Sequence, residues 1–103
     1  MMNARKRKAL EAAGWRFGDA KELLQLSDAE MEVIETRVRL ARAVRALRTE
    51  RGLTQKQLAE IAGSSQPRVA AVERGQGTLD QLIRFMFALG ADRKKVARAI
   101  AAA

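Results

Sequence analysis

The chain has 103 residues with no histidine and no cysteine, so it has the length of one domain and lacks disulfides and the commonest metal ligands and general base. It carries 20 Lys and Arg against 12 Asp and Glu, and the resulting net charge of +8 attracts polyanions, of which nucleic acid is the usual one. We therefore expect no metal, no cofactor and no enzymatic activity. A merely solvated basic surface would explain the charge equally well, so charge alone does not decide the function.

The chain contains no pattern typical of a targeting or membrane segment. The basic run Arg5–Lys8 is not followed by the apolar stretch of a signal peptide. The longest apolar stretches, such as Phe85–Leu89, are far too short to cross a bilayer. We expect a soluble, cytoplasmic protein associated with the nucleoid.

Residues 1–26 are interpreted as a basic arm followed by a lead-in strap. Trp15 and Phe17 stand between two glycines, and their spacing of two does not suit one helix face. An extended strap that lays one or both rings on the body of the protein fits better. Asp19 is then placed to cap a short helix over residues 20–26.

Helix signals occupy nearly all of the chain after this segment, and strand alternation is nowhere sustained, so the fold class is all-α. Ser27 and Glu30 form a capping box that opens a helix from Asp28 to about Glu50, and Gly52 stops it. A stripe of apolar residues recurs at spacings of three and four and is expected to be buried. Its members are Met31, Ile34, Val38, Ala41, Val44 and Leu47.

Two short helices come next. Thr54 and Gln57 predict a capping box for a helix that ends at Ala62, and Gly63–Ser64 form the following turn. Ser65 is the expected N-cap of the second helix, in whose first turn a proline is tolerated, and glycine 75 follows its end.

Two further helices complete the chain. Thr78 with Gln81 predicts a strongly apolar helix over Leu79–Leu89, and Asp92 predicts a cap for a last amphipathic helix. The apolar side chains of these two helices exceed what a monomer can bury, which favours a symmetric dimer.

The most informative stretch is residues 55–75, because two short helices joined by a three- or four-residue turn must cross steeply in a helix-turn-helix. Ala59 is small enough for a close crossing, and Gly63 can adopt the left-handed conformation of a tight turn. Four apolar side chains are expected to point inward and fix the crossing angle: Leu58, Ile61, Val69 and Val72.

This motif resembles that of the Cro/cI-like (XRE) helix-turn-helix family of phage repressors and bacterial regulators. The matching residues are Gln55, Leu58–Ala59, Gly63, Ser65–Gln66, Val69, Val72, Glu73 and Gly75. The frame around the motif, residues 37–89, is also similar. The resemblance implies a compact, five-helix, lambda-repressor-like DNA-binding domain over residues 27–103, with an N-terminal extension and a C-terminal dimerisation helix.

In that family the helix that matches residues 65–74 enters the major groove of double-stranded DNA. The residues implied for base readout are Ser65, Gln66, Pro67, Arg68 and Ala71. Gln66 suits adenine, because an amide can bond to both N6 and N7, whereas Pro67 offers apolar contact alone. Contacts with the DNA backbone are implied for Gln55, Lys56, Arg48, Arg51 and Arg74. Arg48 also matches one member of an arginine–glutamate pair, with Glu73 as the other.

The charge distribution supports this interpretation. Residues 37–78 hold nine Lys and Arg against three Glu, so most of the net charge lies where the motif is. The opening of the chain, from Gly14-Trp15 to Glu30, resembles the lead-in of HigA-like antitoxins, which repress their own operon and neutralise a RelE-like mRNA-cleaving toxin. The residues implied for partner binding are Trp15, Phe17, Leu23 and Leu24.

Three alternatives to a dimeric, autoregulating antitoxin that binds a palindromic operator remain open. The chain could be a stand-alone phage-like repressor, or a helical protein-interaction module. A catalytic role for Glu30, Glu32 and Glu35 is the least favoured, because two of their three spacings place carboxylates on different helix faces and no nucleophile or metal constellation accompanies them.

Overall fold

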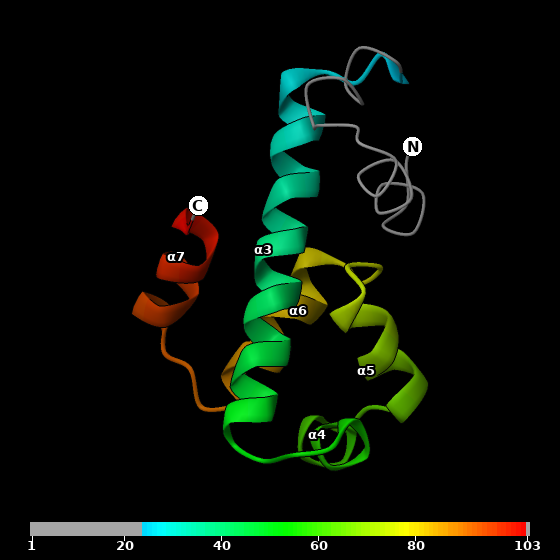
Figure 1. Ribbon diagram of the computed structural model, residues 1–103, viewed down its shortest axis with the longest axis vertical. Coiled ribbons are helices and arrows are strands. Elements are labelled where there is room, and N and C mark those ends of the chain that lie inside the picture. The colour runs from blue at the N-terminus through cyan, green and yellow to red at the C-terminus, as the bar shows by residue number, and fades with distance from the viewer. Residues whose placement is uncertain (1–23, 103) are drawn as a thin grey trace.

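The computed structural model describes residues 24–102, and these form five helices and no strand (Figure 1). The helices are α3 (Asp28–Glu50), α4 (Gln55–Ala62), α5 (Gln66–Glu73), α6 (Leu79–Ala88) and α7 (Arg93–Ala101). The expected all-α fold is therefore confirmed. Within residues 24–102, no helix is both long enough and apolar enough to traverse a bilayer.

Side-chain caps set where these helices begin. Thr54 and Thr78 both form complete capping boxes, as Ser27 does with Glu30, so two backbone N–H groups at the start of each of these three helices have side-chain partners. The Asp92 carboxylate accepts from the Lys95 N–H at 2.8 Å and begins α7. The expected caps of these four helices are confirmed, and the cap expected at Asp19 lies outside the described residues.

The long helix α3 carries the core on its C-terminal half. Helix α3 packs against α6, α7 and α5 (Figure 1), and buried side chains of all four helices belong to one core cluster. The core cluster comprises Leu40, Ala41, Val44, Leu47, Leu58, Ala59, Val69, Val72, Leu82, Phe85, Met86, Leu89 and Val96. Each element contributes apolar area to one shared interior, and this burial is the main favourable term in its stability.

The predicted stripe on α3 is correct at four of its six positions and omits one buried residue. Ile34, Ala41, Val44 and Leu47 are buried, while Met31 and Val38 are only half-buried. Leu40, which the stripe omits, has no exposed surface at all. The reason is that α3 is covered from more than one side, so its buried face is wider than a single line of residues.

The N-terminal half of α3 extends past α4, α5 and α6 (Figure 1). A second, small apolar cluster lies there, in which Leu26 and Ile34 are buried and Leu24 and Met31 pack against them. The helix expected over residues 20–26 does not reach its predicted end, because Gln25 has a φ of +55° and so leaves the helical region before Leu26. The remainder of that helix, and Trp15, Phe17 and Leu23, lie outside the described residues.

Candidate nucleic-acid interface

The turn between α4 and α5 is built on a left-handed glycine. Gly63 has φ +63° and ψ 40°, and the N–H of the next residue, Ser64, donates to the Ala59 carbonyl at 2.8 Å. A side chain with a Cβ is strained in this conformation, whereas glycine is not. The predicted role of Gly63 in reversing the chain within so few residues is confirmed.

The two helices then cross closely. Leu58, Val69 and Val72 are completely buried and Ala59 is 4% exposed, which agrees with their expected structural roles. Ile61, in contrast, is 51% exposed, so the expectation that it points inward is wrong. At 3.6 residues per turn it lies about 100° around α4 from the mean direction of the inward residues, too far to reach α5.

The first turn of α5 faces outward. Ser65 caps the helix by accepting the N–H of Arg68 at 3.3 Å, and Pro67 occupies the first turn, where its missing N–H costs nothing. Ser65, Gln66, Pro67 and Arg68 are exposed, and Ala71 is half-buried. The four exposed side chains expected to read bases thus stand at one end of one helix, available to a ligand.

A buried ion pair attaches α5 to α3. The Arg48 Nε donates to Glu73 Oε2 at 2.5 Å and Nη2 donates to Oε1 at 3.0 Å, while Nη1 donates to the Leu53 carbonyl at 2.8 Å. The side chains are 13% and 4% exposed, respectively. The hydrogen bond that Arg48 donates to Glu73 raises the pKa of Arg48, against the opposing effect of burial, so Arg48 stays charged. The arginine–glutamate pair predicted from the resemblance is present.

The same glutamate starts a chain of hydrogen bonds that ends at the outer surface. Gln55, the first residue of α4, donates from Nε2 to Glu73 Oε1 at 3.2 Å. Gln66, the first residue of α5, donates from Nε2 to Gln55 Oε1 at 2.8 Å. The amide of Gln66 is therefore held in place by a network that reaches back to α3, with its Oε1 and second N–H left over from these contacts.

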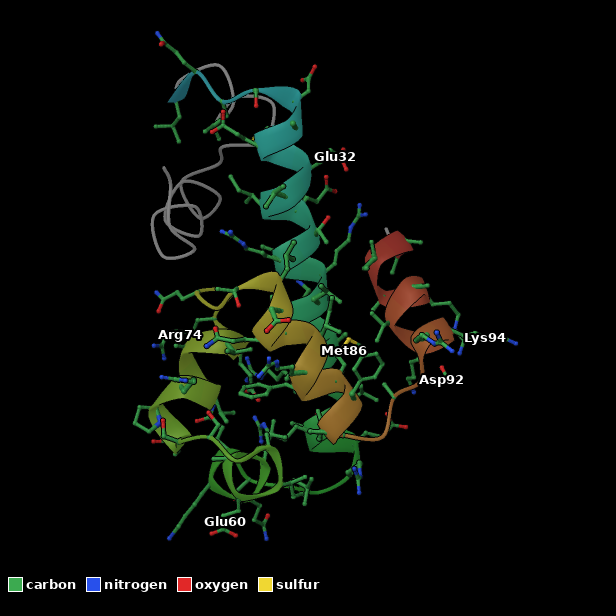
Figure 2. All side chains as sticks on the ribbon, turned by 180° about the vertical axis from the view of Figure 1, so that it is seen from behind. Glu32, Glu60, Arg74, Met86, Asp92 and Lys94 are labelled. Carbon is green, nitrogen blue, oxygen red and sulfur yellow. The ribbon has the colours of Figure 1, made fainter. Side chains whose placement is uncertain are left out.

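Two of the arginines expected on the DNA backbone also have contacts within the protein. Arg48 is mostly buried in the ion pair with Glu73. Arg51 is exposed, and its Nη1 donates to the Leu89 carbonyl at 2.8 Å, at the end of α6. Lys56 and Arg74 are exposed. Figure 2 shows Arg74 on the flank of the molecule opposite Lys94 of α7. Arg48 therefore holds α5 against α3, whereas the expected backbone contact of Arg51 stays a prediction.

A polar groove of about 380 Å³ adjoins the turn, and the sequence pattern did not indicate it. It lies between Gly63–Ser64 and α6, and both Arg68 and Arg84 line it. Arg84 also pairs with Asp80 at 3.0 Å on the exposed face of α6. Arg84 belongs to no sequence motif, and the packing of α6 against α4 brings it to the same groove as Arg68 of α5.

No three His, Cys, Asp or Glu side chains come together in residues 24–102 as a metal site requires. The described part of the interface instead consists of an exposed helix end, a supporting hydrogen-bond network and flanking cations. Its arrangement of two short, steeply crossing helices defines a helix-turn-helix unit.

Comparison with protein families agrees with this geometry. A family model described as a helix-turn-helix domain matches residues 9–94, and the chain belongs to that family. Searches among curated proteins and among solved structures found no match. Family membership supports DNA-binding regulation as the activity, and the match extends N-terminally well beyond the motif itself.

Proposed function

We propose that this protein is a sequence-specific transcriptional repressor of the Cro/cI-like (XRE) type that inserts α5 into the major groove of double-stranded DNA. The observation that carries the proposal is the hydrogen-bonded path from Glu73 through Gln55 to Gln66. A side chain fixed in this way before binding loses less conformational entropy when it meets a base. Gln66 therefore combines exposure with a defined orientation.

The neighbouring side chains suit the same task. The major groove distinguishes all four base pairs by donors, acceptors and the thymine methyl group. Gln66 is assigned to adenine, Arg68 to guanine or a phosphate, and Ala71 to a thymine methyl. Gln55, Lys56 and Arg74 are assigned to phosphates on either side of the groove, where they supply affinity and register without reading sequence.

A homodimer would place two such helices on a palindromic operator, about 34 Å apart. Two large apolar side chains of the C-terminal helices support this. Phe87 of α6 is 45% exposed and Ile100 of α7 is 37% exposed. A two-fold interface that covers them would remove apolar surface from water and pair the recognition helices in one step.

The finer proposal is that the repressor is the antitoxin of a toxin–antitoxin operon, cytoplasmic and associated with the nucleoid. Its support is the resemblance of the lead-in around Trp15 and Phe17 to HigA-like antitoxins, together with the fact that the family match begins at residue 9 and includes this lead-in. A RelE-like toxin would be the partner. A stand-alone repressor is the alternative, and co-purification with the product of an adjacent toxin-like gene distinguishes the two.

DNA binding is tested by selecting sites from a random duplex library with the purified protein and measuring affinity for the selected site by fluorescence anisotropy. Gln66→Ala should weaken binding about 5- to 150-fold, the equivalent of one good bidentate base contact. Arg68→Ala and Arg98→Ala both remove one positive charge, and only Arg68 lies on α5, so Arg98→Ala is the matched control. The absence of an enriched site would refute the proposal, as would Gln66→Ala and Arg68→Ala variants that both bind the site as tightly as the Arg98→Ala control.

The salt dependence of the same titrations distinguishes residues that contact phosphates from residues that contact bases. The logarithm of the affinity should fall by about 0.9 per phosphate contact for each tenfold rise in salt. Lys56→Ala should lower that slope by about one contact and weaken all duplexes alike. Gln66→Ala should leave the slope unchanged and reduce discrimination between sequences.

A further inference from the structure

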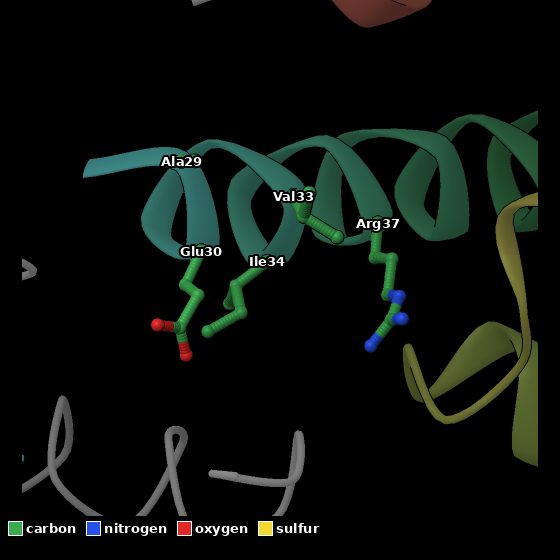
Figure 3. Close-up of a pocket in the computed structure, with 5 residues that line it drawn as sticks. All are labelled: Ala29, Glu30, Val33, Ile34 and Arg37. Carbon is green, nitrogen blue, oxygen red and sulfur yellow. The ribbon is translucent and has the colours of Figure 1, made fainter. Parts of the chain in front are cut away.

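The N-terminal half of α3 carries an apolar groove that the DNA-binding function does not use. Its lining residues are Ala29, Glu30, Val33, Ile34 and Arg37, and its volume is about 230 Å³. Glu30, Ile34 and Arg37 extend from the same side of the helix (Figure 3). The groove adjoins the small cluster around Leu26, outside the main core. We refer to it as the α3 groove.

The chemistry of the α3 groove indicates what it accepts. Val33, one of its lining residues, is 39% exposed, so apolar surface remains to be covered. Arg37 brings a guanidinium whose Nε is buried and has no hydrogen-bond partner within the described part of the chain. The volume is below the ~300–1,000 Å³ of typical small-molecule pockets. An apolar bed with a carboxylate at one end and a guanidinium at the other suits a single indole ring, which offers an apolar face, a cation–π surface and one N–H donor.

We propose that the lead-in segment of this chain, residues 9–23, docks on the α3 groove and that Trp15 is the side chain that fills it. Two observations select this occupant. The chain emerges from the same cluster, because Leu24 packs against Leu26 and Ile34. The family match also begins at residue 9, so the lead-in belongs to the domain and not to an appended tail.

The reach of the chain is sufficient. Nine Cα–Cα steps join Trp15 to Leu24, which span up to roughly 30 Å when extended. The groove runs from Ala29 to Arg37, about 12 Å along the helix at 1.5 Å per residue. The lead-in can therefore fold back along α3 without strain, and docking would extend the apolar core to the exposed half of this helix.

Trp15 is the chain's only tryptophan, so its fluorescence reports directly on the proposed contact. In the full-length folded protein we expect emission at shorter wavelength than in denaturant, with iodide quenching reduced several-fold. Val33→Glu should move the emission toward that of the unfolded chain and restore quenching. Ala46→Glu adds the same charge at another exposed position of α3 and should change neither. Arg37→Gln should restore quenching in part, since it removes the cation and leaves the apolar lining.

Far-UV circular dichroism must show the same helix content for all four proteins, so that a change in Trp15 emission reports the contact and not unfolding. Unfolded-like emission in the parent protein would overturn the proposal, as would a Val33→Glu variant with unchanged emission. Shielding of Trp15 that disappears on dilution would also overturn it, because it would assign the groove to a second copy of the chain. Shielding that is independent of concentration and sensitive to Val33 supports it.

Discussion

The Arg48–Glu73 pair offers the sharpest test of how α5 is held. Glu73→Gln preserves the shape of the side chain but leaves the Arg48 cation, 13% exposed, without its counter-charge. Loss of one partner of a buried pair costs about 3–5 kcal/mol. Because Arg48 keeps its bond to the Leu53 carbonyl and a little solvent contact, we expect the lower end, about 3 kcal/mol. Since 1 kcal/mol moves the Tm of a domain this size by about 4–8 °C, the expected decrease is about 12–24 °C.

Thermal and urea unfolding followed by circular dichroism measure this cost. Asp80→Asn is the control, because it also removes one carboxylate from an arginine pair, but one whose side chains are 76% and 75% exposed. Such surface pairs contribute about 0–1 kcal/mol. If Glu73→Gln is no more destabilising than Asp80→Asn, the buried pair does not hold α5 as inferred.

A double replacement separates stability from DNA binding. Arg48→Met with Glu73→Leu exchanges the buried charges for apolar groups of similar size, which is often neutral or stabilising. The double variant should therefore recover most of the stability lost by Glu73→Gln. It also removes the acceptor for Gln55, on which the orientation of Gln66 depends, so DNA affinity should stay below that of the parent. Recovery of both properties together would contradict a role for the network in presenting Gln66.

Two further predictions concern the packing of the motif. Leu58→Ala should cost about 2–5 kcal/mol in urea unfolding, because it opens a cavity beside α5, whereas Ile61→Ala at a half-exposed position should cost well under half as much; similar costs would place Ile61 in the core after all. Gly77→Ala would bring a Cβ to 2.7 Å from Val72 Cγ2 and should cost about 1–3 kcal/mol by overpacking, whereas Gly63→Ala meets nothing within 4 Å and should cost about 1–2 kcal/mol through its left-handed φ alone. Thermal unfolding of the glycine variants checks this, and a Gly77→Ala protein as stable as the parent would show that Val72 can move aside.

Features of the fold that depend on residues close together in the sequence were mostly predicted correctly, whereas those that depend on contacts between helices were predicted only in part. Caps such as Thr54 with Gln57 join residues three apart, and the residue types at those positions are sufficient to place the start of α4. The left-handed turn at Gly63 is likewise a local property of glycine. Which face of a helix is covered is a different matter. The predicted buried stripe omits Leu40, and the prediction that Ile61 points inward is wrong. Burial depends on which elements surround α3 and α4, and the spacing of residues along one helix does not give this information.

The same difference between local and long-range interactions applies to the candidate interface. Resemblance at the motif positions was enough to select Gln55, Gln66 and Glu73, and the structure joins the three side chains in one hydrogen-bonded path. No sequence pattern indicated that Arg51 would bond to the Leu89 carbonyl, 38 residues along the chain.

The sequence by itself determined the all-α class, the starts of helices α3 to α7 and the helix-turn-helix, because capping, turn and periodicity signals act over a few neighbouring residues. Only the tertiary structure decided which arginines are engaged within the protein and which face solvent, and that the first half of α3 carries a separate apolar groove. Both depend on contacts between elements distant in sequence. The energy of a buried charge or an exposed apolar face is set by what the folded chain places beside it.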